Sequence, residues 1–553
     1  MTVLWAELSL EEIKEIDRDI SLLETQLQRL RAQRNLKIPM ARLPVDVMIH
    51  IFRFCVPHGR SKTRWLAFTH VCRSWRIIAL NQASLWTSID FSNINLARVM
   101  LERSKNAALD ISIPRILYGQ AERWQDVLDD IQHQVHRVRH LHVNMCRVDL
   151  MRAFVHGFQR AAPSLRSLEI WDYANLDLQS GFLGGEAPLL TDLRLYFTYI
   201  SWDSPLLRNL THLELGGDSC SNLPTGNQFL DALRRMPMLS VLKLTQILPR
   251  IIEGTAAVSL PNLQELALLA ETDDIEGCAA VLGHLLFPEA TVIRVSCYSE
   301  SRSDGVFDTV FSQLSSLFSN SASQVESPRT IKSMSVDFET GSGPCSVTVN
   351  ARNTDIPAAS TTTSSRLSLP IIRLDFEWNR SYSQIVDEIQ AAIALLPTNS
   401  LESLHIRGYS GVDGSSEVAD ESNGDQPPVV NILPKVMESL LWSTSIKTLA
   451  LDGFSYVKEL PGLLSMIHAS ADPPICFEDY ADEIGSILNQ LLGILESRSE
   501  NGRKVEKLIL RNCDTILPEQ TALLRQLVGE LDWDFEEMAL EVETQAVPFE
   551  GEQ

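Results

Sequence analysis

The sequence lacks several features that would assign the chain to a common class. No apolar run approaches the roughly 18 residues that span a bilayer. The nine cysteines form no Cys-x-x-Cys pair. Phosphate-binding GxxxxGKS loops, GxGxxG loops, HExxH motifs and GxSxG elbows are also missing. We therefore expect no membrane partner, no disulfide framework, no cofactor and no enzymatic activity.

Length and composition indicate a folded chain with more than one structural unit. The 553 residues exceed what one hydrophobic core usually organises, and 44% hydrophobic with 22% charged residues is typical of a globular protein. The first residues, MTVLWAELSLEE, carry acids where a secretory signal needs cations. The expected location is cytoplasmic, nuclear or both, with reduced thiols.

Charge is unevenly distributed along the chain. The formal net charge is −23, which argues against a chain-wide nucleic-acid or anionic-membrane partner. Between Arg29 and Arg76, however, eleven basic residues stand against one acid, Asp46, giving +10. This basic stretch is either a solvated cationic face or a docking surface for an acidic partner.

Residues 1–37 are predicted to contain an amphipathic helix with a coiled-coil seam. Apolar residues recur in steps of three and four, the spacing that keeps one stripe facing a partner helix. These residues are Ile13, Ile16, Ile20, Leu23, Leu27 and Leu30. With fewer than the usual number of heptads, residues 13–30 either form a homodimer or fold against their own domain.

The following segment has more apolar surface than it can bury. Pro44 is suited to a first helical turn, and nine of the thirteen residues from Pro44 to Val56 are apolar, so this helix is apolar almost all round. A second helical run carries Phe68, Val71, Cys72, Trp75 and Ile78. Since about fifty residues bury only about 60% of their surface, part of this surface is expected to meet another protein.

Residues 38–88 carry a set of short motifs in a characteristic order: Leu43-Pro44, Val47, Ile51-Phe52, Val71-Cys72-Arg73-Ser74-Trp75-Arg76 and Leu85-Trp86. In these motifs the segment resembles the F-box, a three-helix module that binds a Skp-type adaptor. The resemblance implies attachment through the adaptor to the cullin of a ubiquitin ligase, and the basic stretch would suit the acidic adaptor. The adaptor contacts it implies are Leu43, Pro44, Val47, Met48, Ile51, Phe52, Val71, Cys72 and Trp75.

From Trp86 onward, a six-residue pattern recurs: apolar, two variable, apolar, one variable, apolar. Its middle residues are Ile89, Ile111, Leu141, Leu168, Leu193, Leu213, Leu242, Leu266, Ile293, Met334, Ile372, Leu404, Leu449 and Leu508. From Leu141 to Ile293 the steps fall within the roughly 20–29 residues typical of leucine-rich repeats. Residues 89–530 therefore resemble an irregular leucine-rich-repeat solenoid, an α/β fold with parallel strands and convex helices, and a different α/β arrangement remains the alternative.

Polar segments interrupt the pattern in its second half. Ser-, Thr-, Gly- and acid-rich stretches near 300–330, 354–368 and 409–429 are predicted to be disordered insertions. Residues 531–553 are acidic and are predicted to be a tail or a terminal cap. Cys146 and Cys513 occupy the polar finishing position of a repeat and are expected to be structural.

Two groups of residues are candidates for binding. Aromatic residues that follow consecutive strands would line one rim of a solenoid and hold a substrate, or else cover the edge of the core. They are Trp171, Tyr173, Tyr196, Tyr199 and Trp202. Two other sets imitate the spacing of metal ligands: the histidines between His133 and His142, and Cys55, His58, His70 and Cys72. Strand alternation argues against a metal site in the first set, and apolar helical surroundings argue against one in the second.

The sequence predicts a non-enzymatic substrate receptor, in which the basic helical module docks on the adaptor and the acidic remainder binds an unknown target protein. The alternative is a ligase-independent scaffold that dimerises through the N-terminal helix.

Overall fold

The computed structural model describes most of the chain up to residue 320 and the strands of the remainder. The described residues are 10–55, 64–116, 121–145, 147–218, 223–249, 256–301, 305–320, 331–340, 345–353, 371–378, 401–410, 446–452, 492, 495–496, 498–500, 502, 504–511 and 518–533. They fall into two compact units, residues 1–206 and residues 207–553.

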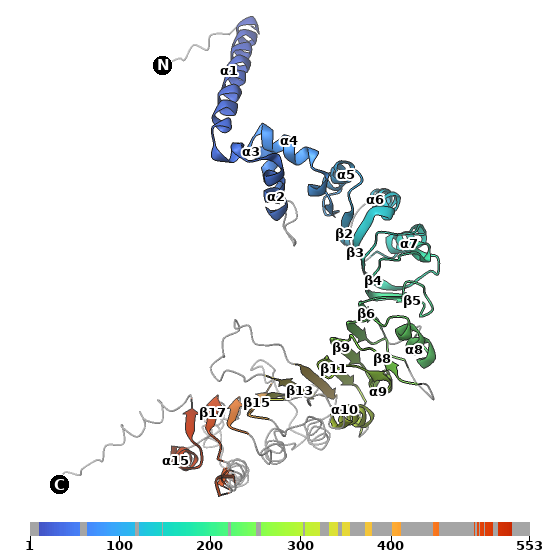
Figure 1. The fold of residues 1–553 in the computed structure, drawn as a ribbon, viewed down its shortest axis with the longest axis vertical. Helices are drawn as coiled ribbons and strands as arrows, with labels where there is room; N and C mark the ends of the chain where they lie inside the picture. Colours follow the sequence, from blue (N-terminus) through green and yellow to red (C-terminus); the bar gives the residue numbers. More distant parts are fainter. Residues whose placement is uncertain are drawn as a thin grey trace, which may run out of the picture. The chain divides into compact units, whose positions relative to one another are not determined.

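The first unit begins with helices and continues with alternating strands and helices (Figure 1). Its helices, with η marking 3-10 turns, are α1 (Leu10–Leu36), η1 (Pro39–Arg42), α2 (Val45–Cys55), η2 (Arg64–Ala67), α3 (Phe68–Val71), α4 (Arg73–Asn81), η3 (Ala83–Leu85), α5 (Ile94–Arg103), α6 (Ala121–Gln134), η4 (Val135–Arg137), α7 (Val148–Gly157) and η5 (Phe182–Gly185). Its strands are β1 (Ser88–Asp90), β2 (Leu109–Ile116), β3 (Val138–Met145), β4 (Ser167–Leu178) and β5 (Asp192–Ile200).

Strands β1 to β5 pair in chain order, and all of these pairs are parallel. Leu141 pairs with Leu168, which pairs in turn with Leu193. These are the middle residues of the six-residue pattern, and all three are buried. Because parallel neighbours need a crossover, helices or turns return the chain between strands, and α5, α6 and α7 lie along one side of the strands (Figure 1).

The second unit holds the remaining strands and four described helices. The strands are β6 (His212–Gly216), β7 (Val241–Thr245), β8 (Val258–Ser259), β9 (Glu265–Ala270), β10 (Leu285–Leu286), β11 (Val292–Ser299), β12 (Ser333–Thr340), β13 (Cys345–Arg352), β14 (Ile372–Trp378), β15 (Ser403–Ser410), β16 (Thr448–Asp452), β17 (Lys507–Arg511) and β18 (Glu530–Trp533). The helices are α8 (Gly226–Arg234), α9 (Ile275–His284), α10 (Asp308–Asn320) and α15 (Pro518–Leu527).

In the second unit the main strand order is β6-β7-β9-β11-β14-β13-β12-β15-β16-β17-β18, while β8 and β10 form a separate parallel pair. The middle residues of the pattern again align across neighbours, as in Leu242 with Leu266 and Leu266 with Ile293. The protein is therefore a mixed α/β structure in which N-terminal helices precede parallel strands.

The order of the central strands differs from the chain order that the repeating pattern predicts. Strand β13, which the pattern did not predict, pairs antiparallel with both β12 and β14. Its alternating Cys345, Val347, Val349 and Ala351 are buried. Together these three strands form an antiparallel meander that enters the sheet with β14 beside β11 and β12 beside β15.

Two expectations about the second half need correction, and several others fall outside the described residues. Residues near 300–330 are not disordered throughout, because α10 forms at Asp308–Asn320 and buries Val310, Phe311 and Leu314. The predicted acidic tail starts too early, because its first three residues belong to β18, which pairs with β17. Residues 354–368, most of 409–429, Cys146 and Cys513 lie outside the described residues.

Candidate functional site

Helix α2 packs one apolar stripe into a small aromatic core. Met48 and Phe52, four residues apart, are buried. The Phe52 ring stacks on Phe68 from α3 with 4.9 Å between ring centroids, and it lies 5.3 Å from Trp75 of α4. Phe68 and Trp75 are 6.2 Å apart. These rings hold three short helical pieces together.

The run from Phe68 to Ile78 is not one continuous helix as its spacing predicts. Cys72 adopts an extended conformation with φ −159° and ψ 168°, which ends α3 and starts α4. The break turns α4 so that Trp75 can meet Phe52. Cys72 itself is half-buried.

A second aromatic contact joins this helical segment to the first strand. Trp65 and Trp86 pack edge to face at 4.9 Å, and both are buried. The Trp86 indole N–H donates a 2.8 Å hydrogen bond to the Ala79 carbonyl of α4, and the Arg103 guanidinium lies 4.5 Å above the Trp86 ring. The helices are thereby fixed to the strands that follow.

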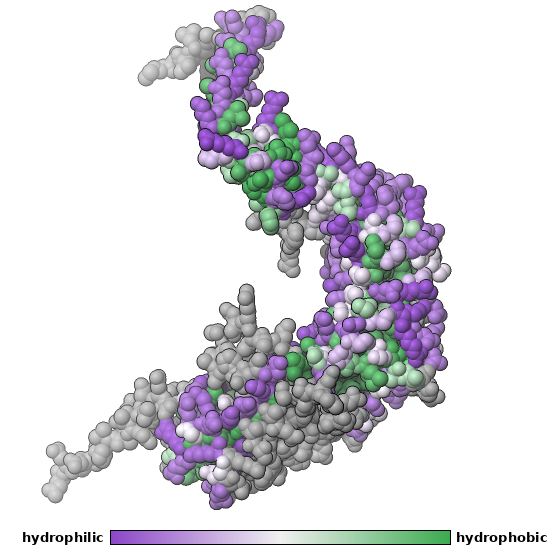
Figure 2. Space-filling model, viewed as in Figure 1, coloured by the Kyte–Doolittle hydropathy of each residue, from purple (hydrophilic) through white to green (hydrophobic). Residues whose placement is uncertain are grey.

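A second stripe of α2, beside the buried one, carries apolar residues that are exposed or only half-buried. Val47 is 41% exposed, Phe54 is 90% exposed and Ile51 between them is half-buried. Val71 at the end of α3 is 57% exposed. We call Val47, Ile51, Phe54 and Val71 the apolar docking surface. Hydrophobic atoms are visible over this helical segment in Figure 2.

The predicted adaptor contacts divide between the core and the surface. Pro44, Val47 and Val71 are exposed, and Leu43, Ile51, Cys72 and Trp75 are half-buried. Met48 and Phe52 are 2% and 0% exposed, so they support the surface from within and cannot themselves touch a docked protein. Phe54 was not among the predicted residues, and it is exposed where the spacing of Val47 and Ile51 continues along α2.

The solvent side of the first unit's strands carries one pair of stacked aromatic rings. Trp171 on β4 and Tyr196 on β5 are register partners, and their rings stack at 3.6 Å with 19° between the planes. Both side chains are half-exposed. They form a flat aromatic platform on the sheet.

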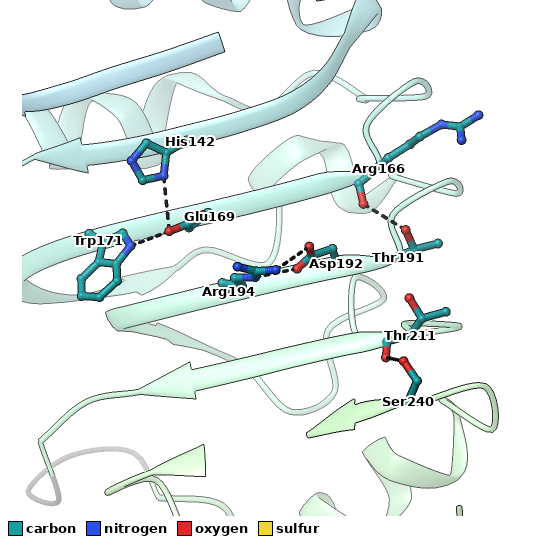
Figure 3. A network of polar contacts seen from close by, with 9 residues as sticks. All are labelled: His142, Arg166, Glu169, Trp171, Thr191, Asp192, Arg194, Thr211 and Ser240. Atoms are coloured by element: carbon teal, nitrogen blue, oxygen red, sulfur yellow. Dashed lines mark hydrogen bonds and ion pairs between the residues drawn. The ribbon is translucent and has the colours of Figure 1, made fainter. Parts of the chain in front are cut away.

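A carboxylate beside this platform is held in its ionised form. His142 lies 3.4 Å from Glu169, and the Trp171 indole N–H donates a 2.8 Å hydrogen bond to the same carboxylate (Figure 3). The contact with His142 is the main cause that lowers the Glu169 pKa to about 2, and the Trp171 bond acts in the same direction. The platform is therefore bordered by negative charge at neutral pH.

The other predicted aromatic contacts do not join the platform. Tyr199 and Trp202 are each 6% exposed, so they cover the core of the first unit instead of facing a ligand. The prediction that they line an exposed rim is therefore wrong for these two residues. The side chain of Tyr173 lies outside the described residues.

Charged side chains occupy the outward positions of the second unit's strands, a feature that the sequence interpretation overlooked. Glu265 on β9 lies 3.4 Å from Lys243 on β7 and also pairs with Arg294 on β11. Asp375 on β14 accepts hydrogen bonds from Thr348 at 2.8 Å and from its neighbours Ser296 and Arg373. Such ladders tie adjacent strands together through their exposed face.

Burial perturbs one carboxylate in this charged region. Desolvation raises the pKa of Asp337 on β12, and the nearby guanidinium groups of Arg407 and Arg352 oppose the increase. Arg407 lies 3.7 Å from Asp337 across the β12–β15 pair. Because this face carries charges of both signs, it is better suited to polar contacts than to apolar ones.

The described ranges hold no candidate metal site and no helix suited to cross a membrane. No group of three or more His, Cys, Asp or Glu side chains there is arranged to hold a metal ion. His140 and His142 instead face Asp110 and Glu169, at 3.8 and 3.4 Å. No described helix combines the length and apolarity that crossing a membrane requires.

Comparison with known families assigns the segment that carries the docking surface. Residues 40–92 match the sequence model of the F-box-like family. This match supports the interpretation of the chain as an F-box protein and suggests the role of a ubiquitin-ligase adaptor. The matched range covers α2, α3, α4 and β1, including the docking surface. F-box domains in general bind Skp-type adaptors. No curated protein matches the chain significantly.

Proposed function

We propose that the chain is a non-enzymatic substrate receptor of a Skp-cullin-F-box ubiquitin ligase. Residues 40–92 dock on the Skp-type adaptor and through it on the cullin, while the strand region binds the protein to be ubiquitinated. Catalysis belongs to other subunits, and this chain acts by raising the local concentration of the target near them. Such a receptor works in the cytoplasm, the nucleus or both.

The observation that carries the proposal is the apolar docking surface on the F-box-like segment. Exposed Val47, Phe54 and Val71 lie on a module whose own core is already formed by Phe52 and Trp75. Exposed apolar side chains that share one stripe of a helix, as Val47 and Phe54 do on α2, mark a contact with another protein. Because the core is complete without them, a docked adaptor can cover them without unfolding the module.

The charge around the docking surface favours an acidic partner. Arg42, Arg53, Arg73 and Arg76 are all exposed within the basic stretch. Arg53 donates hydrogen bonds of 2.9–3.1 Å to Ser84, which fixes its guanidinium at the end of α2. An acidic adaptor would associate faster through this complementarity, and salt would weaken that effect.

For the strand region, the proposal is an irregular leucine-rich-repeat solenoid that presents its strands to the target. The in-register parallel strands with helices on one side support it. The Trp171–Tyr196 platform is the proposed anchor, since aromatic side chains dominate binding energy in many interfaces.

A binding measurement with recombinant Skp-type adaptor tests the docking role on the full-length protein. Val47→Glu places a charge in the apolar contact and should weaken binding at least tenfold. The matched control is Val148→Glu on α7, because Val148 is 42% exposed and Val47 is 41% exposed. Val148→Glu should bind as the wild type does. Absence of adaptor binding by the wild type, or equal losses in both variants, would refute the docking proposal.

A ligase-independent scaffold is the second candidate, favoured by the exposed apolar side chains of α1, which lies outside the F-box-like segment. The two candidates differ in cells. Ubiquitination of bound partners should fall with Val47→Glu if the chain is a receptor, and should not change if it is only a scaffold.

A further inference from the structure

Helix α1 presents a continuous apolar seam that nothing else in the described structure covers. Six residues, spaced by three and four, form the seam, and they are 43–63% exposed. They are Ile13, Ile16, Ile20, Leu23, Leu27 and Leu30. From Glu12 to Leu36 every residue is exposed except Asn35, which is half-buried. Since most helices draw their stability from packing, a helix this exposed is expected to have a partner.

The charge of α1 changes sign along its length. Residues 10–24 hold six acidic and two basic side chains, a formal charge of −4, whereas residues 25–36 hold three arginines and no acid, a charge of +3. Two copies aligned head to tail would set each acidic section against the basic section of the other copy. The helix is therefore complementary to itself in only one of the two orientations.

The residues that flank the seam speak against a parallel pair. With Ile13 at heptad position a, Glu12 and Asp19 occupy g, and Asp17 and Glu24 occupy e. Parallel pairing brings each g residue beside the following e residue of the other helix. Glu12 would then face Asp17, and Asp19 would face Glu24, twice each in the dimer. An antiparallel pair loses all four of these acid contacts, because Glu12 and Asp19 then lie beside Gln33 and Gln26 of the other helix. It introduces two others, Asp17 beside Glu24 on each side of the seam.

We propose that α1 pairs with α1 of a second copy of this chain as an antiparallel two-helix coiled coil. In an antiparallel coiled coil, each residue at heptad position a packs against a residue at position d of the other helix. Here all six seam residues pair in this way about one two-fold axis. Ile13 lies against Leu30 of the second copy, Ile16 against Leu27 and Ile20 against Leu23. The short seam makes the dimer reversible.

The antiparallel pair does not depend on the receptor proposal. Helix α1 ends at Leu36, before the F-box-like segment begins at residue 40. Loss of self-association would therefore leave adaptor binding intact, and loss of adaptor binding would leave the dimer intact. If both proposals hold, one assembly carries two docking surfaces and two strand regions.

Sedimentation of the full-length protein over about three decades of concentration tests self-association. The sharpest comparison uses two adjacent leucines, Leu23 in the seam at 62% exposure and Leu22 beside it at 58%. Leu23→Gln should raise the dimer dissociation constant about 100-fold, because a symmetric dimer loses the buried side chain twice. Leu22→Gln should leave the constant within about threefold of the wild type. A wild-type monomer at every concentration, or equal effects of both substitutions, overturns the proposal.

Orientation is tested separately with engineered cysteines and with charge. In the Ile13→Cys/Leu30→Cys double variant, mass spectrometry should find the 13–30 disulfide. These residues are about 26 Å apart within one helix, so that bond must join two copies. Bonds joining 13 to 13 and 30 to 30 would show a parallel pair and refute the proposal. Glu12→Lys with Asp19→Lys should weaken the antiparallel dimer, whereas stronger dimerisation would likewise indicate parallel helices.

Discussion

Replacing Phe52 by alanine should unfold the F-box-like module, whereas the same change at Phe54 should not. Phe52 is fully buried between Phe68, at 4.9 Å, and Trp75, at 5.3 Å. Removing such a ring costs about 3–5 kcal/mol. A core of about fifty residues supplies no more than about 5 kcal/mol of stability, so Phe52→Ala removes most of it. Phe54 is 90% exposed, and its replacement should cost less than about 0.5 kcal/mol.

Hydrogen exchange with mass spectrometry on the full-length protein measures this difference. Peptides from α2 (Val45–Cys55) and α4 (Arg73–Asn81) should exchange much faster in Phe52→Ala, while peptides from α7 keep their protection. Phe54→Ala should exchange as the wild type does. Unchanged protection of α2 in Phe52→Ala would show that the aromatic core does not hold the helices together, and the division of α2 into a buried and an exposed stripe would then be wrong.

Three further changes test the strand region by chemical or thermal denaturation. Glu169→Gln should lower the free energy of unfolding by about 1 kcal/mol at pH 7, a value reduced for the partial exposure of Glu169. Because folding lowers the pKa of Glu169 from 4.5 to about 2, the stability difference between wild type and variant should narrow as the pH falls below 4.5. A stability difference that stays constant down to about pH 3.5 would contradict the lowered pKa. Thr225→Ala breaks the capping box with Gln228 at the start of α8 and should cost about 1 kcal/mol, whereas Thr225→Ser should restore most of it. Gly277→Ala should destabilise the second unit by about 1–3 kcal/mol, since the new methyl would lie 2.5 Å from the Pro249 carbonyl oxygen, and any gain in stability would refute this contact.

The strands and their register could be predicted because one local pattern determines both. Middle residues such as Leu168 and Leu193 enter the core, and burial of the same position in every repeat forces neighbours into alignment. Strand β13 could not be found in this way. Cys345 and Val347 alternate with polar residues as in any half-buried strand, and alternation does not reveal whether a neighbour is parallel or antiparallel.

Residues near the end of a strand are harder to place, as the aromatic candidates show. Trp171 and Tyr196 remain within β4 and β5, so strand alternation puts both on the same solvent face. Tyr199 lies beyond Phe197, whose φ of 55° interrupts the regular alternation of β5. Trp202 follows the end of that strand and turns inward. The sequence reveals neither this backbone irregularity nor its effect on side-chain direction.

The docking surface shows why a helix that is apolar on most sides needs a structure before its binding residues can be assigned. Val47 and Met48 are equally apolar neighbours, and a helical projection places them on adjoining stripes with nothing to distinguish inside from outside. The decision comes from distant residues: Phe68 and Trp75 meet Phe52, which turns the Met48 side inward. Cys72 interrupts the helix between Phe68 and Trp75. A continuous helix would not bring both rings to Phe52 in this way. The extended residue at position 72 therefore helps determine which stripe of α2 is left for a partner.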